Sequence, residues 1–274
     1  NATFDNRELS RHYPRGENYL RKAFEQFNVL STVEWFEKRG VKLKTYPDNC
    51  IFPQSNDSQT IIDCFVKEAL DLGVRIETGS NVKMIKQTDN GFELHINEER
   101  MLVDRLIVTI GGQPKRSGLT FLENLGHSII EPVPSLFTFN MPGNPIRELM
   151  GNVVEKTKVR IEGSKLMGSG PLLVTHWGMS GPAILQLSAW GARYLFDRNY
   201  EFAILVNWLD ERTELELRTK LEQVLREHGG KMIANLNPFS MTSRLWEHLL
   251  DRSEIPHDLR WKDIGKKHSN KLVN

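Results

Sequence analysis

The stretch VKMIKQTDNGFELHINEERMLVDRLIVTIGG, residues 82–112, decides the fold. Three short alternating segments, Val82–Gln87, Phe92–Asn97 and Arg100–Val103, are separated by the turn sequences Asp-Asn-Gly and Asn-Glu-Glu. This pattern predicts a three-stranded β-meander. The continuous apolar run Leu106–Ile110 then predicts a strand buried on both faces.

A glycine pair, Gly111-Gly112, ends this predicted buried strand. Two glycines at the carboxyl end of a parallel strand let backbone amides approach a ligand, and α/β folds bind cofactors at this edge. A simple turn without a ligand is the alternative interpretation. Val74–Thr78 predicts one further strand just before the meander, so the order is strand, meander, buried strand and glycine pair.

The segments before the meander are mainly helical. Helical spacing predicts helices over residues 19–27 and from Ser31 to Gly40, followed by a short strand over Val41–Lys44. A further helix is capped by Asp57 or Ser58 and ends near Gly73.

The segments after the meander change from strands to helices. Strands are predicted at Leu136–Asn140, Val153–Ile161, Leu172–His176 and Phe202–Trp208, with one helix over Pro182–Phe196. The remaining residues predict three helices, at Glu214–Glu227, Ser240–Asp251 and Leu259–His268.

Composition and charge are those of an ordinary globular protein. The 274 residues are 39% hydrophobic and 26% charged, which argues against disorder. The net charge of +1 makes a nucleic-acid partner unlikely, and we interpret the short basic clusters Arg7–Arg21 and Lys262–Lys271 as solvated faces. No apolar run suffices for a membrane span.

Cys50 and Cys64 are too few for a disulfide framework and lack partners at metal spacing, so we expect a cytoplasmic protein without a metal site.

The longest motif is THWGMSGPAIL, residues 175–185. It predicts a strand-to-helix corner in which Ser180 caps the helix and Pro182 occupies its first turn. Free amides at that helix start could bind an anion or a carbonyl, and His176 could donate a proton to a substrate. Alternatively, His176 and Ser180 only hold the corner together, and Trp177 and Met179 are its packing.

Motifs along nearly the whole chain resemble the bacterial FAD-dependent flavoprotein family of BaiN- and RdsA-like proteins, which includes bile-acid enone reductases and aminoacetone oxidase-like enzymes. Residues 175–185 resemble the family's F-T-H-x-G-x-S-G-P-A-x-L. Four shorter stretches are also similar: Asn1-Ala2-Thr3 to the end of G-G-G-R-C-N-x-T-N, Ile51–Ser55 to F-P-x-S, Leu125-Gly126-His127 to L-G-H-T/S, and Pro134-Ser135-Leu136 to P-A/S-L.

The resemblance implies an FAD site and a substrate side. In such flavoproteins a meander interrupts the Rossmann sheet, and its first residue hydrogen-bonds the adenine through its backbone; Val82 holds that place here, with an ordinary strand valine as the alternative. The implied cofactor-binding residues are Asn1, Val82, Thr109, Gly111 and Gly112. The implied substrate-side loop holds Trp177, Gly178, Ser180 and Gly181, beside His176 as the candidate catalytic residue.

The sequence departs from the family after the glycine pair. Most members continue S-Y-P-x-T-G-S-T-G-D-G-Y, whereas residues 113–120 read QPKRSGLT. The family's G-x-G-x-x-G, expected before Asn1, and its G-E-x-x-D segment are not in this sequence. Two or three absent hydrogen bonds to the pyrophosphate would cost about 3–9 kcal/mol, so we expect the chain alone to bind FAD poorly. Unpaired strand edges make self-association plausible.

These observations predict an α/β fold with α+β insertions. We expect a partial Rossmann-like FAD-binding domain with a β-meander (1–132), a β-rich, barrel-like insert (133–208) and a helical insert (209–274). The resemblance implies a fragment of an FAD-dependent oxidoreductase acting on a small carbonyl, enone or amine substrate, with NAD(P)H as a possible donor. The alternative is a non-catalytic binding module, derived from a flavoprotein, for a protein or RNA partner.

Overall fold

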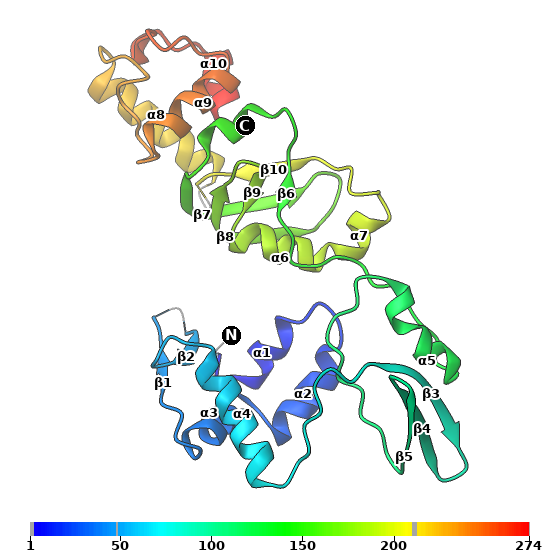
Figure 1. The fold of residues 1–274 in the computed structure, drawn as a ribbon. Helices are drawn as coiled ribbons and strands as arrows, with labels where there is room; N and C mark the ends of the chain where they lie inside the picture. The colour runs from blue at the N-terminus through cyan, green and yellow to red at the C-terminus, as the bar shows by residue number, and fades with distance from the viewer. Residues whose placement is uncertain (1–2, 48, 210–212, 274) are drawn as a thin grey trace. The chain divides into compact units, whose positions relative to one another are not determined.

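The computed structural model describes residues 3–47, 49–209 and 213–273. Contacts divide the chain into two compact units, residues 1–131 and 132–274. Figure 1 shows a helical and meander-containing first unit and a second unit in which a sheet is followed by helices. The division into three domains stays a prediction.

The first part of unit 1 is four helices and a small hairpin. Its elements are α1 (Asn6–Arg11), α2 (Glu17–Gln26), α3 (Val29–Glu37), β1 (Leu43–Thr45), β2 (Ile51–Pro53) and α4 (Gln59–Asp71). The helix predicted before Gly73 is confirmed. Ser58 is its N-cap residue but makes no side-chain cap, and Oδ1 of Asp57, one residue earlier, accepts a hydrogen bond from Gln59 N at 2.9 Å. Helix α1 and strand β2 were not predicted, because six and three residues are too few for a periodic pattern to emerge.

The predicted meander is confirmed. Strands β3 (Val82–Thr88), β4 (Gly91–Ile96) and β5 (Glu99–Val103) form an antiparallel sheet in the order β3-β4-β5. The directly opposed pair Ile85 and Leu94 is buried and forms the apolar centre of this sheet.

Two other strand predictions in unit 1 are wrong. Neither Val74–Thr78 nor Leu106–Ile110 is a strand, and among the described strands none pairs with them. The run expected to be buried on both faces is exposed, Ile107 to 86%. A parallel strand needs hydrogen-bonded neighbours and covering helices, and neither segment has a neighbouring strand in the part described. The Rossmann-like sheet and the self-association of such edges therefore stay predictions.

Unit 2 begins with a curled, five-stranded antiparallel sheet. Its strand order is β10-β7-β8-β9-β6. The strands are β6 (Phe139–Asn140), β7 (Val153–Ile161), β8 (Met167–Val174), β9 (Gly178–Ser180) and β10 (Ile204–Asn207). Three of the four predicted strands have direct counterparts in β7, β8 and β10; the fourth, at Leu136–Asn140, shortens to β6, and β9 was not predicted.

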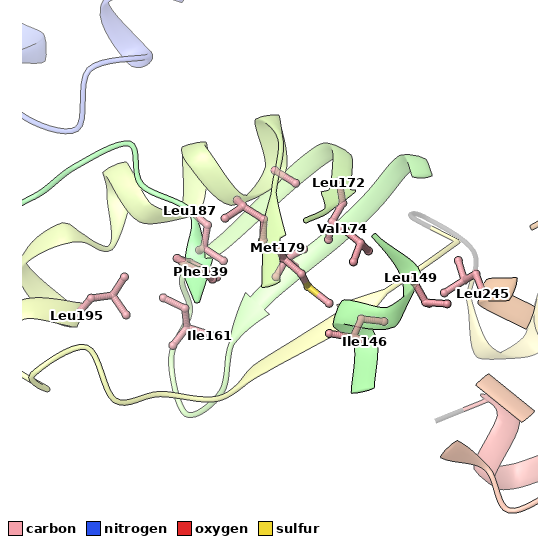
Figure 2. Packing of buried hydrophobic residues seen from close by; sticks show 13 residues of the cluster. Phe139, Ile146, Leu149, Ile161, Leu172, Val174, Met179, Leu187, Leu195 and Leu245 are labelled. Carbon is pink, nitrogen blue, oxygen red and sulfur yellow. The ribbon is translucent and has the colours of Figure 1, made fainter. Parts of the chain in front are cut away.

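Helix α6 (Pro182–Trp190) covers one face of this sheet, as Figure 2 shows. The side chains of Val159, Ile161, Leu172 and Leu187 are fully buried between helix and sheet. The single helix predicted over Pro182–Phe196 is in fact two, α6 and α7 (Ala192–Phe196), with Gly191 between them. This packed layer holds the end of β8 and the start of β9, which residues 175–177 connect.

The helices that follow the sheet form a second core. The 3-10 helix η2 (Pro145–Leu149) precedes β7, and α8 (Glu214–His228), α9 (Ser243–Arg252), the 3-10 helix η3 (Trp261–Asp263) and α10 (Lys266–Val273) follow the sheet. The last helix was predicted seven residues too early, because η3 occupies the start of that range. Trp246 and Trp261 stack at the centre of this core, with ring centroids 6.3 Å apart.

Helix α9 connects the two cores of unit 2. Leu245 belongs to the core of the sheet, beside Leu149 in Figure 2, whereas the next residue, Trp246, belongs to the helical core. Arg244, which also belongs to α9, donates a hydrogen bond to the carbonyl of Glu148 in η2. The sheet and the helices that follow it are therefore packed against each other through α9.

In the described part of the chain, no helix combines the length and apolar character needed to cross a membrane. The same residues include no cluster of three or more His, Cys, Asp or Glu side chains arranged to hold a metal ion.

Candidate functional site

A tight corner between β8 and β9 holds the candidate catalytic histidine. The amide of Thr175 donates to the carbonyl of Gly178 at 2.7 Å, and the amide of Gly178 donates back to the carbonyl of Thr175 at 3.2 Å. The Thr175 hydroxyl oxygen also accepts from the amides of Trp177 and Gly178. These bonds fix the backbone on both sides of His176, so its side chain is presented from a rigid turn.

The glycines of this motif are required by close backbone contacts. Gly178 has φ +155°, and a Cβ there would lie 2.3 Å from the carbonyl oxygen of Phe139 in the neighbouring strand β6. Gly181 has φ +97°, and its Cβ would lie 2.7 Å from the Pro171 carbonyl oxygen. Both positions therefore require glycine for packing of the backbone.

Ser180 does not cap the helix, so that prediction is wrong. Ser180 still lies in β9, opposite Leu173. The N-cap residue of α6 is Gly181, which makes no side-chain cap. Pro182 does occupy the first turn, as predicted.

His176 and Trp177 point away from the core and are exposed. Their ring centroids lie 4.6 Å apart, and the indole is 56% accessible to solvent. The carbonyl of His176 accepts a hydrogen bond of 2.7 Å from Nε of Arg147, which comes from η2. The corner thus places an imidazole beside an indole, and a guanidinium nitrogen against the backbone carbonyl of His176.

A cavity of about 430 Å³ opens beside these groups. It is lined by Arg147, Glu148 and His176 together with the Gly143–Pro145 turn. Imidazole and guanidinium groups donate hydrogen bonds, and an exposed indole offers a flat apolar surface. This arrangement suits a planar molecule that carries a carbonyl oxygen.

Arg147 and Glu148 were missed by the sequence analysis. They lie 29 and 28 residues before His176 and reach it only because η2 packs against the end of β8. The local signal is limited to a turn, in which Asn144 Oδ1 accepts from the amide of Ile146. Such a turn gives no indication of its tertiary partner.

The predicted cofactor-binding residues lie in unit 1. Val82 begins β3 opposite Ile96, and Thr109, Gly111 and Gly112 lie in an exposed segment without regular structure. A Cβ added at Gly111 or Gly112 would meet no atom within 4 Å, and Gly111 has φ +72°. Asn1 lies outside the described residues.

The fold of unit 2 defines the class of protein: a barrel-type antiparallel sheet followed by a helical domain, with an exposed histidine corner at one end of the sheet. Residues 133–274 match the family model described as the HI0933-like protein barrel and H2TH domain. The chain therefore belongs to the HI0933-like family. This confirms, at the level of the family, the predicted relationship to flavoprotein oxidoreductases.

Individual relatives align along most of the chain. It is 22% identical over 280 residues to the 3-dehydro-bile acid delta(4,6)-reductase of Clostridium scindens, covering 96% of this chain and 68% of the relative. It is also 22% identical over 265 residues to the ribosomal RNA dihydrouridine synthase of Escherichia coli, covering 94% of this chain and 63% of the relative. The Haemophilus influenzae protein of the same name is 25% identical over 68% of this chain and 49% of its own length. The chain thus spans about half to two thirds of these relatives.

Proposed function

We propose that this chain belongs to a flavin-dependent reductase that adds hydride to a carbon–carbon double bond conjugated with a carbonyl group, with NAD(P)H as the electron source. One observation carries the proposal: two relatives that align with more than nine tenths of the chain have names that describe such a reduction. One name denotes a Δ4,6 reductase of a 3-oxo compound, and the other a synthase of dihydrouridine, in which the double bond of the uracil ring is reduced.

The proposed reaction consists of a hydride transfer followed by a protonation. The reduced flavin, when bound, supplies a hydride to the carbon β to the carbonyl, and the electron pair of the double bond moves toward the carbonyl oxygen. A proton then adds to the α carbon, so that the substrate gains two electrons and two protons. The protein must stabilise negative charge on the oxygen and provide the proton.

Residues at the corner are suited to both tasks. His176 is the proposed proton donor, because it is exposed on the cavity and fixed by a backbone turn. Arg147 holds the His176 carbonyl through Nε and adds positive charge where the substrate oxygen becomes negative. Trp177 offers a face on which a conjugated ring can stack.

The flavin would be held from unit 1. We assign its adenine to the backbone at Val82 and its ring system to the exposed segment Thr109–Gly112. These assignments rest on the resemblance and on the absence of any atom within 4 Å of a Cβ at either glycine.

The test uses the protein expressed from its complete gene and purified with its bound flavin. Turnover is measured with NADH or NADPH and two acceptors, a cyclic α,β-unsaturated ketone and a uridine-containing RNA, since the two relatives named above differ in substrate. His176→Ala is expected to lower kcat by about 10²–10⁴-fold with unchanged flavin content. His257→Gln, an exchange at an exposed histidine outside the cavity, is the control. Full turnover of His176→Ala would refute the role of His176, and a colourless protein would refute the proposed function.

A further inference from the structure

The helical part of unit 1 encloses a second, larger cavity. It lies among α1, α2, α3, the β1–β2 hairpin and the start of α4, and its volume is about 840 Å³. Pockets of roughly 300–1,000 Å³ accommodate drug-sized molecules. All of the residues that line it belong to unit 1, so the cavity is separate from the His176 corner.

The walls of this cavity are aromatic and aliphatic. Five rings line it, those of Tyr13, Phe24, Phe27, Phe36 and Phe52. Phe27 and Phe52 are each 53% exposed, and neither α2 nor α3 has a buried residue. Phe24 of α2 and Val29, Val33 and Phe36 of α3 line the cavity, where a ligand would remove apolar surface from water.

Among the described residues that line the cavity there is no Asp, Glu, Lys, Arg or His. A ligand with a full charge would lose its hydration there without gaining an opposite charge in return. A neutral ligand is therefore favoured over an ionised one of the same shape.

Among the polar side chains that line the cavity, which also include the hydroxyls of Tyr13, Thr32 and Ser58, two asparagine amides offer hydrogen-bond donors. Oδ1 of Asn28 accepts from the amide of Ser31 at 3.1 Å, and Oδ1 of Asn56 accepts from the Tyr46 hydroxyl at 2.8 Å. Because both amide oxygens are engaged as acceptors, the two NH₂ groups are the parts left to act as donors. A ligand with an acceptor oxygen would match them.

We propose that this cavity is a binding site for a neutral, ring-containing, apolar small molecule that carries a hydrogen-bond acceptor oxygen. The site is additional to the proposed reductase function and does not depend on the flavin.

Fluorescent probes test the site directly. Prodan is a neutral naphthalene with a ketone oxygen, and 8-anilino-1-naphthalenesulfonate is a naphthalene of similar size with a fixed negative charge. The full chain, without added flavin, is expected to bind prodan with a blue-shifted emission and at least tenfold more tightly than the sulfonate. Equal or tighter binding of the sulfonate would overturn the neutral-ligand assignment, and unshifted prodan emission, as expected if another segment or a second copy fills the cavity, would overturn the site itself.

Matched variants locate the probe. Phe27→Ala removes one aromatic ring from the lining of the cavity, and Phe4→Ala removes a similarly exposed ring outside it. We expect prodan binding to weaken about fivefold in Phe27→Ala and to stay unchanged in Phe4→Ala. Asn56→Asp replaces an NH₂ donor with an oxygen, and Asn97→Asp makes the same change at another turn with φ +54°. Prodan binding should weaken severalfold in Asn56→Asp and not in Asn97→Asp. Equal effects within either pair would place the probe elsewhere, and circular dichroism of each variant checks that the fold is retained.

Discussion

Replacing Gly178 with alanine should destabilise unit 2 through a backbone contact that only glycine permits. The added Cβ would lie 2.3 Å from the Phe139 carbonyl oxygen and 2.9 Å from the amide nitrogen of Met141. Both atoms belong to backbone, so no side-chain rotation can relieve the contact, and β6 must move away from β9. The corner that presents His176 would move with it.

The expected cost follows from two contributions. Holding an alanine at φ +155° costs of order 1–3 kcal/mol. Separation of β6 from β9 also weakens the hydrogen bond of 2.8 Å from the Met141 amide to the Trp177 carbonyl, and each such bond contributes about 0.5–1.5 kcal/mol. The total is about 2–4 kcal/mol, which for a unit of this size lowers Tm by roughly 6–15 °C.

Gly163→Ala is the matched control. Gly163 also has a positive φ, +72°, in unit 2, but a Cβ there meets nothing within 4 Å. Its expected cost is only the conformational one, about 1–2 kcal/mol. Both variants are compared by calorimetry on the full chain, following the transition of unit 2. If Gly178→Ala were no less stable than Gly163→Ala, the close approach of β6 to the corner would be refuted.

Three further changes address the helical core. Thr213→Ala removes the capping box with Glu216 at the start of α8 and should cost about 1 kcal/mol in urea unfolding. Trp246→Phe removes the indole N–H that donates to the buried Ile233 carbonyl at 2.9 Å, and should cost about 1–3 kcal/mol in the same assay. Burial, aided by nearby positive charge, lowers the pKa of His248 below its usual 6.5. The unfolded chain therefore binds this proton more readily, stability should fall as the pH drops below about 6.5, and His248→Gln should flatten that fall.

Each of these outcomes has a contradicting result. Thr213→Ala with unchanged stability would mean that the box is not formed in solution, and an unaffected Trp246→Phe would mean that water replaces the indole. A pH profile of His248→Gln identical to that of the unmodified chain would assign the loss of stability to other groups. His12→Gln, at an exposed histidine in unit 1, controls for the exchange itself.

Local patterns predicted the elements that local interactions determine. The meander was found because its turn sequence, Asp89-Asn90-Gly91, and the alternation around it are both short-range signals. Helix α4 was predicted with its cap and its end at Gly73, and helix α8 was predicted over Glu214–Glu227. In each of these cases the residues that fix the element lie within a few positions of one another.

Predictions that depended on distant partners were less successful. The run Leu106–Ile110 has the composition of a buried strand, but burial requires neighbours on both sides, and among the described residues none pairs with it. Strand β9 was missed because its three residues, Gly178–Ser180, are ordered by pairing with β8 and β6 rather than by their own composition.

The candidate site shows the same difference. His176 and Trp177 were predicted because they lie within one specific motif, whereas Arg147 reaches them from η2, a separate element, and carries no motif of its own. Gly178 and Gly181 were predicted as substrate-side residues, which stays a prediction, and the structure shows that both are also required by close backbone contacts. The motif therefore combines exposed groups able to act on a ligand with glycines that the backbone requires.

The most direct test of the proposed reductase is an anaerobic titration of the protein expressed from its complete gene. NADH or NADPH should bleach the visible absorption of its flavin, and a conjugated carbonyl acceptor should restore it, with one hydride found on the carbon β to the carbonyl. A protein without flavin, or a reduced flavin that neither the cyclic enone nor the uridine-containing RNA reoxidises, would contradict the account.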